Sequence, residues 1–246
     1  MGGKNAIIVD DDADLDEAIP GVVTSAFGYA GQKCSACSRV IVVGRIYRDF
    51  MDRLIDATAS LKVGPAEDPA TFVGPVIDEE AARRITAVIE KGRQEAKLVF
   101  QAPLPPQLDG YFVPPTIFTD VAPRSALAQE EIFGPVLVVL AAKDFTEALR
   151  LANAVRFGLT GGVYSRNPAH LAQAREDFTV GNLYFNRAIT GAVVGRQPFG
   201  GLKLSGSGAA AGGPDYLLEF VLPHTITENT VRHSFVPEAS GSQLAT

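Results

Sequence analysis

A cysteine beside an apolar run has the clearest chemical potential of any residue in this chain. Cys34 follows a glycine-containing loop and precedes the apolar residues 40–43. A thiol at a loop-to-strand junction is open to a small electrophile, whereas a thiol inside the run would be packed and unreactive. Free cysteines are also among the most buried residues, so position alone favours a packed, unreactive side chain.

The second cysteine, Cys37, gives the spacing C-x-x-C, which fits a redox pair, half of a zinc site or a coincidence. We expect no metal site, because there is no second cysteine pair and His170, His224 and His233 are scattered. We expect Cys37 to be packed in the strand that follows. Two reduced thiols fit a cytoplasmic protein, and this is the location we expect.

Composition narrows the class of protein. The 246 residues can form one large domain or two small ones, and 46% hydrophobic with 20% charged residues is typical of a globular protein. A net charge of −6 without a basic cluster argues against nucleic acid as a partner. The chain has neither an apolar run of membrane-spanning length nor the pattern of a signal peptide, so we expect no membrane partner.

Short apolar runs alternate with helical periodicity along the chain. This alternation predicts an α/β fold with a mostly parallel sheet flanked by helices. Glycine-rich residues 191–213 are expected to form loops, and the prolines at 103–106 and 114–115 mark irregular chain. The predicted strands are 6–9, 40–43, 136–141, 162–165 and 181–185, and the predicted helices are 14–27, 48–61, 78–98, 145–153 and 168–178.

One apparent dinucleotide fingerprint is rejected. Residues 206–211 match G-x-G-x-x-A, and Glu228 lies about twenty residues further on. The fingerprint needs a strand before it and a helix after it. Residues 202–205 make a poor strand and Pro214 would stop the helix, so we expect no dinucleotide at this point.

The sequence around Cys34, Gly-Gln-Lys-Cys-Ser-Ala-Cys-Ser-Arg, resembles the nucleophile motif of the aldehyde dehydrogenase superfamily. It is most similar to the 1-pyrroline-5-carboxylate (L-glutamate γ-semialdehyde) dehydrogenase branch. Further motifs of the superfamily follow in its order and cover almost the whole chain. They lie at residues 2–5, 74–75, 110–116, 130–135, 186 and 191–201.

The resemblance implies that Cys34 is a catalytic nucleophile. A thiolate adds to an aldehyde to give a thiohemiacetal, a nicotinamide takes the hydride, and water hydrolyses the thioester. The backbone N–H of Cys34 would help to hold the oxyanion. The implied activity is the NAD-dependent oxidation of L-glutamate 5-semialdehyde to L-glutamate in proline catabolism.

The resemblance also implies a binding loop for the substrate. Ser35 with Gly191 and Ala192 would hold the α-carboxylate, because a hydroxyl and exposed backbone N–H groups form an anion nest. Phe199 would pack on the aliphatic part. Without the resemblance, these residues read as a glycine-rich turn with Phe199 in the core.

Two residues of the segment 130–135 are implied to contact the cofactor. Glu131 would accept hydrogen bonds from the nicotinamide ribose, and Phe133 would lie beside the nicotinamide. From the residues alone, this segment also fits a solvated turn before a proline.

The resemblance assigns residues 1–214 to a catalytic domain and residues 215–246 to an oligomerisation strand and tail, and hence implies a homo-oligomer. In the superfamily a glutamate directly precedes the motif at 2–5, and an N-terminal half binds most of the NAD. We therefore expect a catalytic-domain fragment with little or no turnover by itself. The alternatives are another aldehyde dehydrogenase subfamily, a non-catalytic truncated oligomer partner, and a thiol-based binder or weak esterase.

Overall fold

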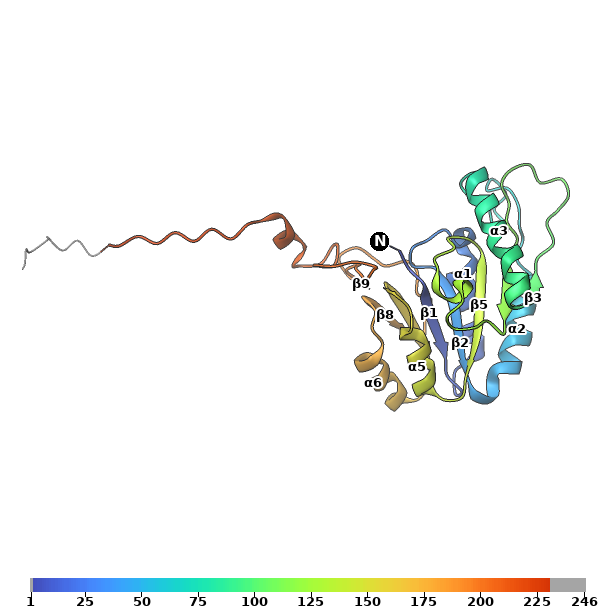
Figure 1. Ribbon diagram of the computed structural model, residues 1–246, viewed down its shortest axis with the longest axis horizontal. Helices are drawn as coiled ribbons and strands as arrows, with labels where there is room; N and C mark the ends of the chain where they lie inside the picture. The colour runs from blue at the N-terminus through green and yellow to red at the C-terminus, as the bar shows by residue number, and fades with distance from the viewer. Residues whose placement is uncertain (1, 231–246) are drawn as a thin grey trace, which may run out of the picture.

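The computed structural model describes residues 2–230, and its centre is a seven-stranded sheet in the order β3-β4-β5-β2-β1-β7-β8 (Figure 1). Every neighbouring pair is parallel except β3 with β4. Two further strands, β6 and β9, pair with each other outside this sheet. The strands are β1 (Asn5–Val9), β2 (Cys37–Val43), β3 (Lys97–Gln101), β4 (Thr116–Thr119), β5 (Val136–Ala142), β6 (Phe157–Gly158), β7 (Thr160–Tyr164), β8 (Asn182–Phe185) and β9 (Leu202–Lys203).

Within residues 2–230, six α-helices connect the strands, and four of them begin at a side-chain cap. Asp14, Asp78, Asp144 and Asn167 each accept a hydrogen bond from a backbone N–H of the first turn, which satisfies a donor that has no partner within the helix. The helices are α1 (Leu15–Phe27), α2 (Tyr47–Ala59), α3 (Glu79–Glu95), α4 (Ala126–Gln129), α5 (Phe145–Asn153) and α6 (Pro168–Asp177), with 3-10 turns at Gly28–Gly31, Gly44–Ile46 and Tyr216–Phe220.

The core lies around the middle of the sheet. All five residues of β1 are buried, as expected for a parallel strand covered on both faces. Helix α5 packs against β1, β2 and β5, while α1 packs against α2, β2 and β5. The predicted fold class, a mostly parallel sheet flanked by helices, is confirmed.

Within residues 2–230, no helix has the length and apolarity needed to cross a membrane.

The expected helix 78–98 is too long at its C-terminal end. Helix α3 ends at Glu95, and Ala96 is extended with φ −149° and ψ 169°. Lys97 to Gln101 then form the edge strand β3, which pairs antiparallel with β4. Neither strand was predicted, because the apolar residues of β3 continue the helical pattern and prolines precede β4.

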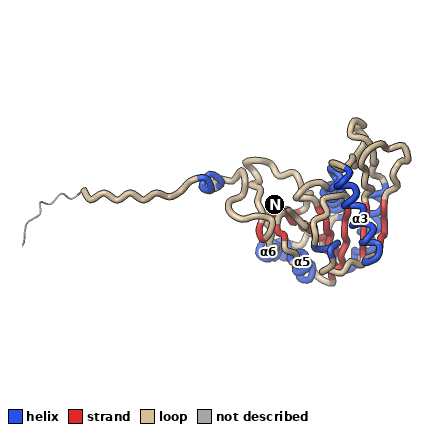
Figure 2. The backbone as a smooth tube through the Cα atoms, turned by 45° about the horizontal axis from the view of Figure 1, so that its top comes forward, coloured by secondary structure: helices blue, strands red, loops and turns tan. Residues whose placement is uncertain are grey.

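The C-terminal part of the described chain also differs from expectation. Residues 215–230 run away from the sheet and contain the 3-10 turn Tyr216–Phe220 but no strand (Figures 1 and 2). A strand forms only where a second strand supplies hydrogen bonds, and no strand of residues 2–230 pairs with this segment. The remainder of the expected tail, from residue 231, lies outside the described residues.

Parallel pairing brings several predicted site residues to one edge of the sheet. Because parallel strands all start at the same edge, the segments that lead into β1, β2 and β5 are neighbours there. Gly3 precedes β1, Cys34 precedes β2, and Glu131 precedes β5. The candidate site therefore lies at the amino-terminal edge of the sheet.

Candidate active site

Cys34 lies in a tight turn directly before β2. The turn is closed by a hydrogen bond of 3.0 Å from the Ala36 N–H to the Lys33 carbonyl. Cys34 is partly exposed, whereas Cys37 is only 2% exposed and lies in β2 as expected. Burial raises the pKa of the Cys37 thiol to about 12. Of the two thiols, Cys34 is therefore the one available for reaction near neutral pH.

The side chain of Asn5 holds this turn. Its Nδ2 donates to the carbonyl oxygens of Cys34 and Ala36, both at 2.8 Å, and its Oδ1 accepts from the Thr160 N–H at 3.0 Å. The Thr160 hydroxyl also donates to the Ser35 carbonyl at 3.2 Å. One amide thus connects the starts of β1 and β7 to the turn that carries Cys34. The sequence analysis included Asn5 in the motif at residues 2–5 but assigned it no role. A polar residue at the start of a buried strand was a signal that could have indicated one.

The chain before the turn has an unusual backbone. Tyr29, Ala30 and Gly31 have φ values of 60°, 53° and 67° in succession, in the left-handed region that side chains disfavour. A Cβ at Gly31 would lie 2.4 Å from the Gly134 carbonyl oxygen. The loop therefore fits closely against the segment that carries Glu131 and Phe133.

The two expected cofactor residues have different environments. Glu131 accepts a hydrogen bond of 2.8 Å at Oε1 from the Gly3 N–H. Phe133 has φ 55° and a 41% exposed side chain that helps to line a cavity of about 680 Å³. The volume of this cavity is typical of a site for a small molecule. The cavity is lined by Tyr29, Gln32, Ala66, Thr71, Phe72, Gly74, Pro75, Val76, Ile77 and Phe133.

The expected substrate loop is anchored separately. The Ile189 N–H donates to the Ser25 hydroxyl at 3.1 Å, and Phe199 and Ala211 exchange two backbone hydrogen bonds of 2.9 Å. Gly191 has φ 79°, with open space where a side chain would stand. Among residues 2–230, no hydrogen bond joins Gly191, Ala192 or Phe199 to Cys34 or Ser35.

Two buried cations lie beside the site. Arg39 donates to the carbonyl oxygens of Lys4, Leu151 and Ala152, whereas the Nζ of Lys4 has no hydrogen-bond partner within the described part of the chain. Burial, with a smaller contribution from the Arg39 charge, lowers the pKa of Lys4 to about 7, and the Glu131 carboxylate opposes this shift. Lys4 therefore loses its charge more readily than an exposed lysine.

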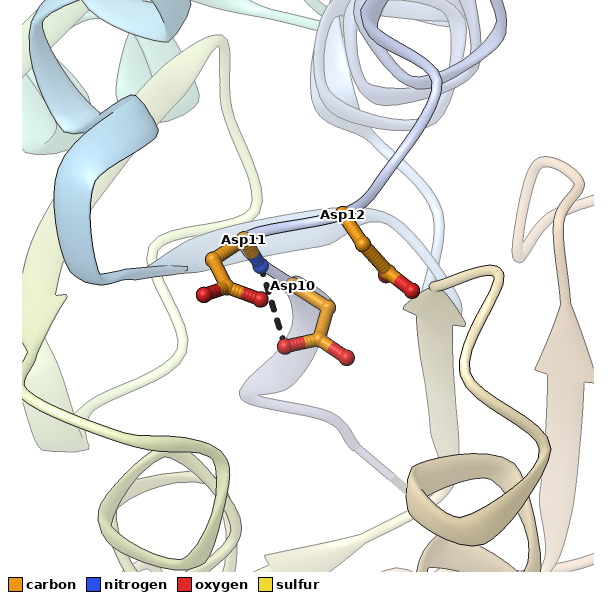
Figure 3. Close-up of side chains that lie close together, drawn as sticks. All are labelled: Asp10, Asp11 and Asp12. Atoms are coloured by element: carbon orange, nitrogen blue, oxygen red, sulfur yellow. Dashed lines mark hydrogen bonds between the residues drawn. The ribbon is translucent and has the colours of Figure 1, made fainter.

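A group of three aspartates lies at the opposite edge of the sheet, directly after β1 (Figure 3). Asp10, Asp11 and Asp12 each place a carboxylate oxygen within 4.8 Å of the others. The fully buried Asp10 Oδ2 accepts from the Ser165 hydroxyl and lies 2.6 Å from the Nδ1 of His170, while Asp12 also accepts from Ser165. These bonds tie the ends of β1 and β7 to α6, which is a structural role.

The chain matches a known protein family over most of its length. A family model described as "Aldehyde dehydrogenase family" matches residues 1–226. The 1-pyrroline-5-carboxylate dehydrogenase of Geobacillus sp. (strain WCH70) is 51% identical over 228 residues, and that of Bacillus subtilis (strain 168) is 49% identical. Each alignment covers 93% of this chain and 44% of the relative, so the chain spans less than half the length of these proteins.

Solved structures agree with the sequence comparison. A proline utilization A protein from Bdellovibrio bacteriovorus, inactivated by N-propargylglycine, superimposes with a TM-score of 0.90 at 53% identity, over 96% of this chain and 24% of that one. A 1-pyrroline-5-carboxylate dehydrogenase from Thermus with bound NAD gives 0.85 at 53% identity, over 89% and 42%.

Proposed function

Because the chain belongs to the aldehyde dehydrogenase family, we propose that it carries the nucleophile of an NAD-dependent dehydrogenase that oxidises L-glutamate 5-semialdehyde to L-glutamate in proline catabolism. The semialdehyde is the open form of 1-pyrroline-5-carboxylate, which the names of the relatives give as their substrate. The observation that carries the proposal is a partly exposed thiol, Cys34, in a turn held by Asn5 at the family's motif.

Cys34 performs the first step. Its thiolate adds to the aldehyde carbon to form a thiohemiacetal, and the backbone N–H of Cys34, which has no partner among residues 2–230, donates to the new oxyanion. A bound NAD supplies the acceptor for the hydride that leaves this carbon. The resulting thioester on Cys34 is then hydrolysed by water, which releases the carboxylic acid and the thiol.

The cavity beside the Cys34 loop supports the use of NAD. Its exposed Phe133 and Tyr29 rings offer apolar surface for a flat nicotinamide. The Oε1 of Glu131 is engaged by Gly3, and we propose that Oε2 accepts from the ribose hydroxyls. We expect most other NAD contacts to come from outside this chain, since the chain covers 44% of its relatives' length.

For the substrate, we propose that Ser35, Gly191 and Ala192 hold the α-carboxylate and that Phe199 packs on the methylene groups. The open space and positive φ at Gly191 support a backbone nest for an anion. Ser35 lies directly after the nucleophile, and the Thr160 hydroxyl holds its carbonyl.

We further propose a catalytic domain over residues 1–214 and an oligomerisation segment after it. Within residues 215–230, Leu217, Phe220, Leu222 and Ile226 expose apolar side chains, which supports their burial against a second copy. Pairing with that copy would supply the hydrogen-bond partner that a strand needs. The two free thiols fit the predicted cytoplasmic location.

The proposal is tested by protecting the thiol with substrate. Iodoacetamide labelling, mapped by mass spectrometry, should modify Cys34 before Cys37, and L-glutamate 5-semialdehyde should slow the labelling of Cys34. Propanal lacks the carboxylate and should protect only at much higher concentration. Equal protection by both aldehydes would favour another subfamily of aldehyde dehydrogenases, and no protection would favour a non-catalytic oligomer partner.

The expected low turnover of the chain alone needs a separate measurement. NADH formation from L-glutamate 5-semialdehyde and NAD is followed by absorbance. Turnover at the rate of an ordinary enzyme, of about 10 s⁻¹, would contradict that expectation.

A further inference from the structure

The side chain of Gln32 spans from the Cys34 loop to the wall of the large cavity. Its Oε1 accepts a hydrogen bond of 2.9 Å from the Ile77 N–H. Its Nε2 donates, at 3.4 Å each, to the carbonyl oxygens of Pro75 and Tyr29. A single amide thus contacts two segments that lie 43 to 45 residues apart along the chain.

Two of these hydrogen bonds, those with Pro75 and Ile77, join the loop to this wall. Within the described residues, no other bond joins residues 27–36 to residues 72–77. Pro75 and Ile77 line the cavity together with Gln32, and Cys34 follows Gln32 by two residues. Within the described residues, this amide is therefore the polar side chain that joins the loop of the thiol directly to this wall of the cavity.

The backbone of the loop is strained, so it is expected to change conformation if the contacts that hold it are lost. Two non-glycine residues, Tyr29 and Ala30, have a left-handed conformation, and such residues persist only where the surroundings hold them. On one side the loop is held by its close fit to Gly134. On the other side the Gln32 amide holds it, by donating to Tyr29 itself and to Pro75.

We propose that Gln32 is a positioning residue, whose amide sets the Cys34 thiol relative to the wall formed by residues 72–77. The inference rests on the proposed function, because the orientation of the thiol matters only if Cys34 attacks an aldehyde. Gln32 touches neither the thiol nor the reacting atoms in this role. It acts through the loop.

Three variants test this role. Gln32→Met keeps the length of the side chain but loses all three hydrogen bonds, whereas Gln32→Glu keeps the acceptor for the Ile77 N–H. Gln173→Met is the matched control, because Gln173 lies on α6 and makes one long hydrogen bond of 3.5 Å to Thr146. Each chain is labelled with iodoacetamide across a pH series, and amide exchange is measured at Ile77.

In Gln32→Met, we expect Cys34 to be labelled roughly fivefold faster at the high-pH plateau, and Ile77 to exchange faster by a similar factor, as for the loss of a hydrogen bond. Cys37 should stay protected, which separates a released loop from a loosened fold. Gln32→Glu should restore slow exchange at Ile77 and bring the plateau rate of Cys34 back toward wild type. The control should match wild type at all three residues.

The outcomes separate the two proposals. If Cys34 of wild type is labelled before Cys37 but Gln32→Met changes neither Cys34 nor Ile77 by more than about twofold, well below the expected effect, the role of Gln32 is overturned and the proposed function stands. A parallel rise at Cys37 also overturns it, because Gln32 would then stabilise the fold as a whole. If Cys34 of wild type is no more reactive than Cys37, both proposals fail.

Discussion

The amide of Asn5 donates to the carbonyl oxygens of both Cys34 and Ala36, each at 2.8 Å, and thereby holds the turn around Cys34 from a neighbouring strand. Its remaining oxygen accepts from Thr160, so all three bonds are made to backbone groups. The side chain acts as a polar connector inside an apolar sheet. An isolated polar group in such a place would be costly, and this one is satisfied.

Replacing Asn5 by leucine should therefore be expensive. Asn5→Leu keeps the approximate shape but leaves buried backbone groups unpaired, at about 1–3 kcal/mol for each. We expect the free energy of unfolding, measured with urea, to fall by about 3 kcal/mol or more. Asn153→Leu is the control, since Asn153 also bonds two backbone groups but in an exposed setting. Equal losses in the two variants would contradict the connecting role of Asn5.

Lys4 should destabilise the fold in a pH-dependent way. Its pKa is about 7 when folded and 10.5 as the unperturbed value, so between these pH values the unfolded chain binds more protons. The contribution of Lys4 to the free energy of unfolding therefore rises with pH from about 7 to 10.5. Below pH 7 the folded state carries the full cost of burying the charged amine.

Lys4→Met should remove this dependence and stabilise the protein at pH 7, by an amount on the order of a few kcal/mol. The measurement is the difference in urea midpoint between wild type and variant at pH 6, 8 and 9.5, which should shrink as the pH rises. Lys97→Met, at an exposed lysine of β3, should bring no gain. A Lys4→Met difference that is constant with pH would refute the assignment.

Replacement by alanine should lower the stability of the protein at Gly31 but not at Gly28. Gly31 has φ 67°, and a Cβ would meet the Gly134 carbonyl at 2.4 Å, so the backbone must shift. We expect Gly31→Ala to lower the free energy of unfolding by roughly 1–3 kcal/mol, and to alter the rate of Cys34 labelling. Gly28 has φ −57° and open space around it, so Gly28→Ala should be neutral or slightly stabilising. Thermal melting compares the two, and similar losses would argue against the close fit of the loop.

The two thiols should differ in their pH dependence. Burial raises the pKa of Cys37 to about 12, so its labelling should stay slow up to pH 9 in the folded chain. Cys34→Ala should therefore abolish rapid labelling at pH 8, whereas Cys37→Ala should leave it unchanged. Rapid labelling that survives in Cys34→Ala would show that Cys37 is reachable.

Local signals in the sequence anticipated most of the elements and failed where distant segments decide. Apolar runs such as 40–43 lead to buried strands under almost any parallel arrangement, and aspartate caps mark the starts of α1, α3 and α5. The end of α3 was missed because Leu98 and Phe100 continue the helical pattern, yet they pair with β4 once that strand lies alongside. The segment after Asp215 was expected as a strand, but a strand depends on a partner that periodicity does not reveal.

The sequence by itself determined the α/β class and the family, because both depend on residue types and short spacings, and the family motif in turn pointed to Cys34 as the candidate nucleophile. Only the tertiary structure decided how Cys34 is held. Parallel pairing brings the starts of β1, β2, β5 and β7 to one edge of the sheet, so that Asn5 and Glu131 reach backbone groups far away in the chain. The roles of Asn5 and Gln32 arise from these contacts, since a hydrogen bond is set by distance in space and not by position in the chain.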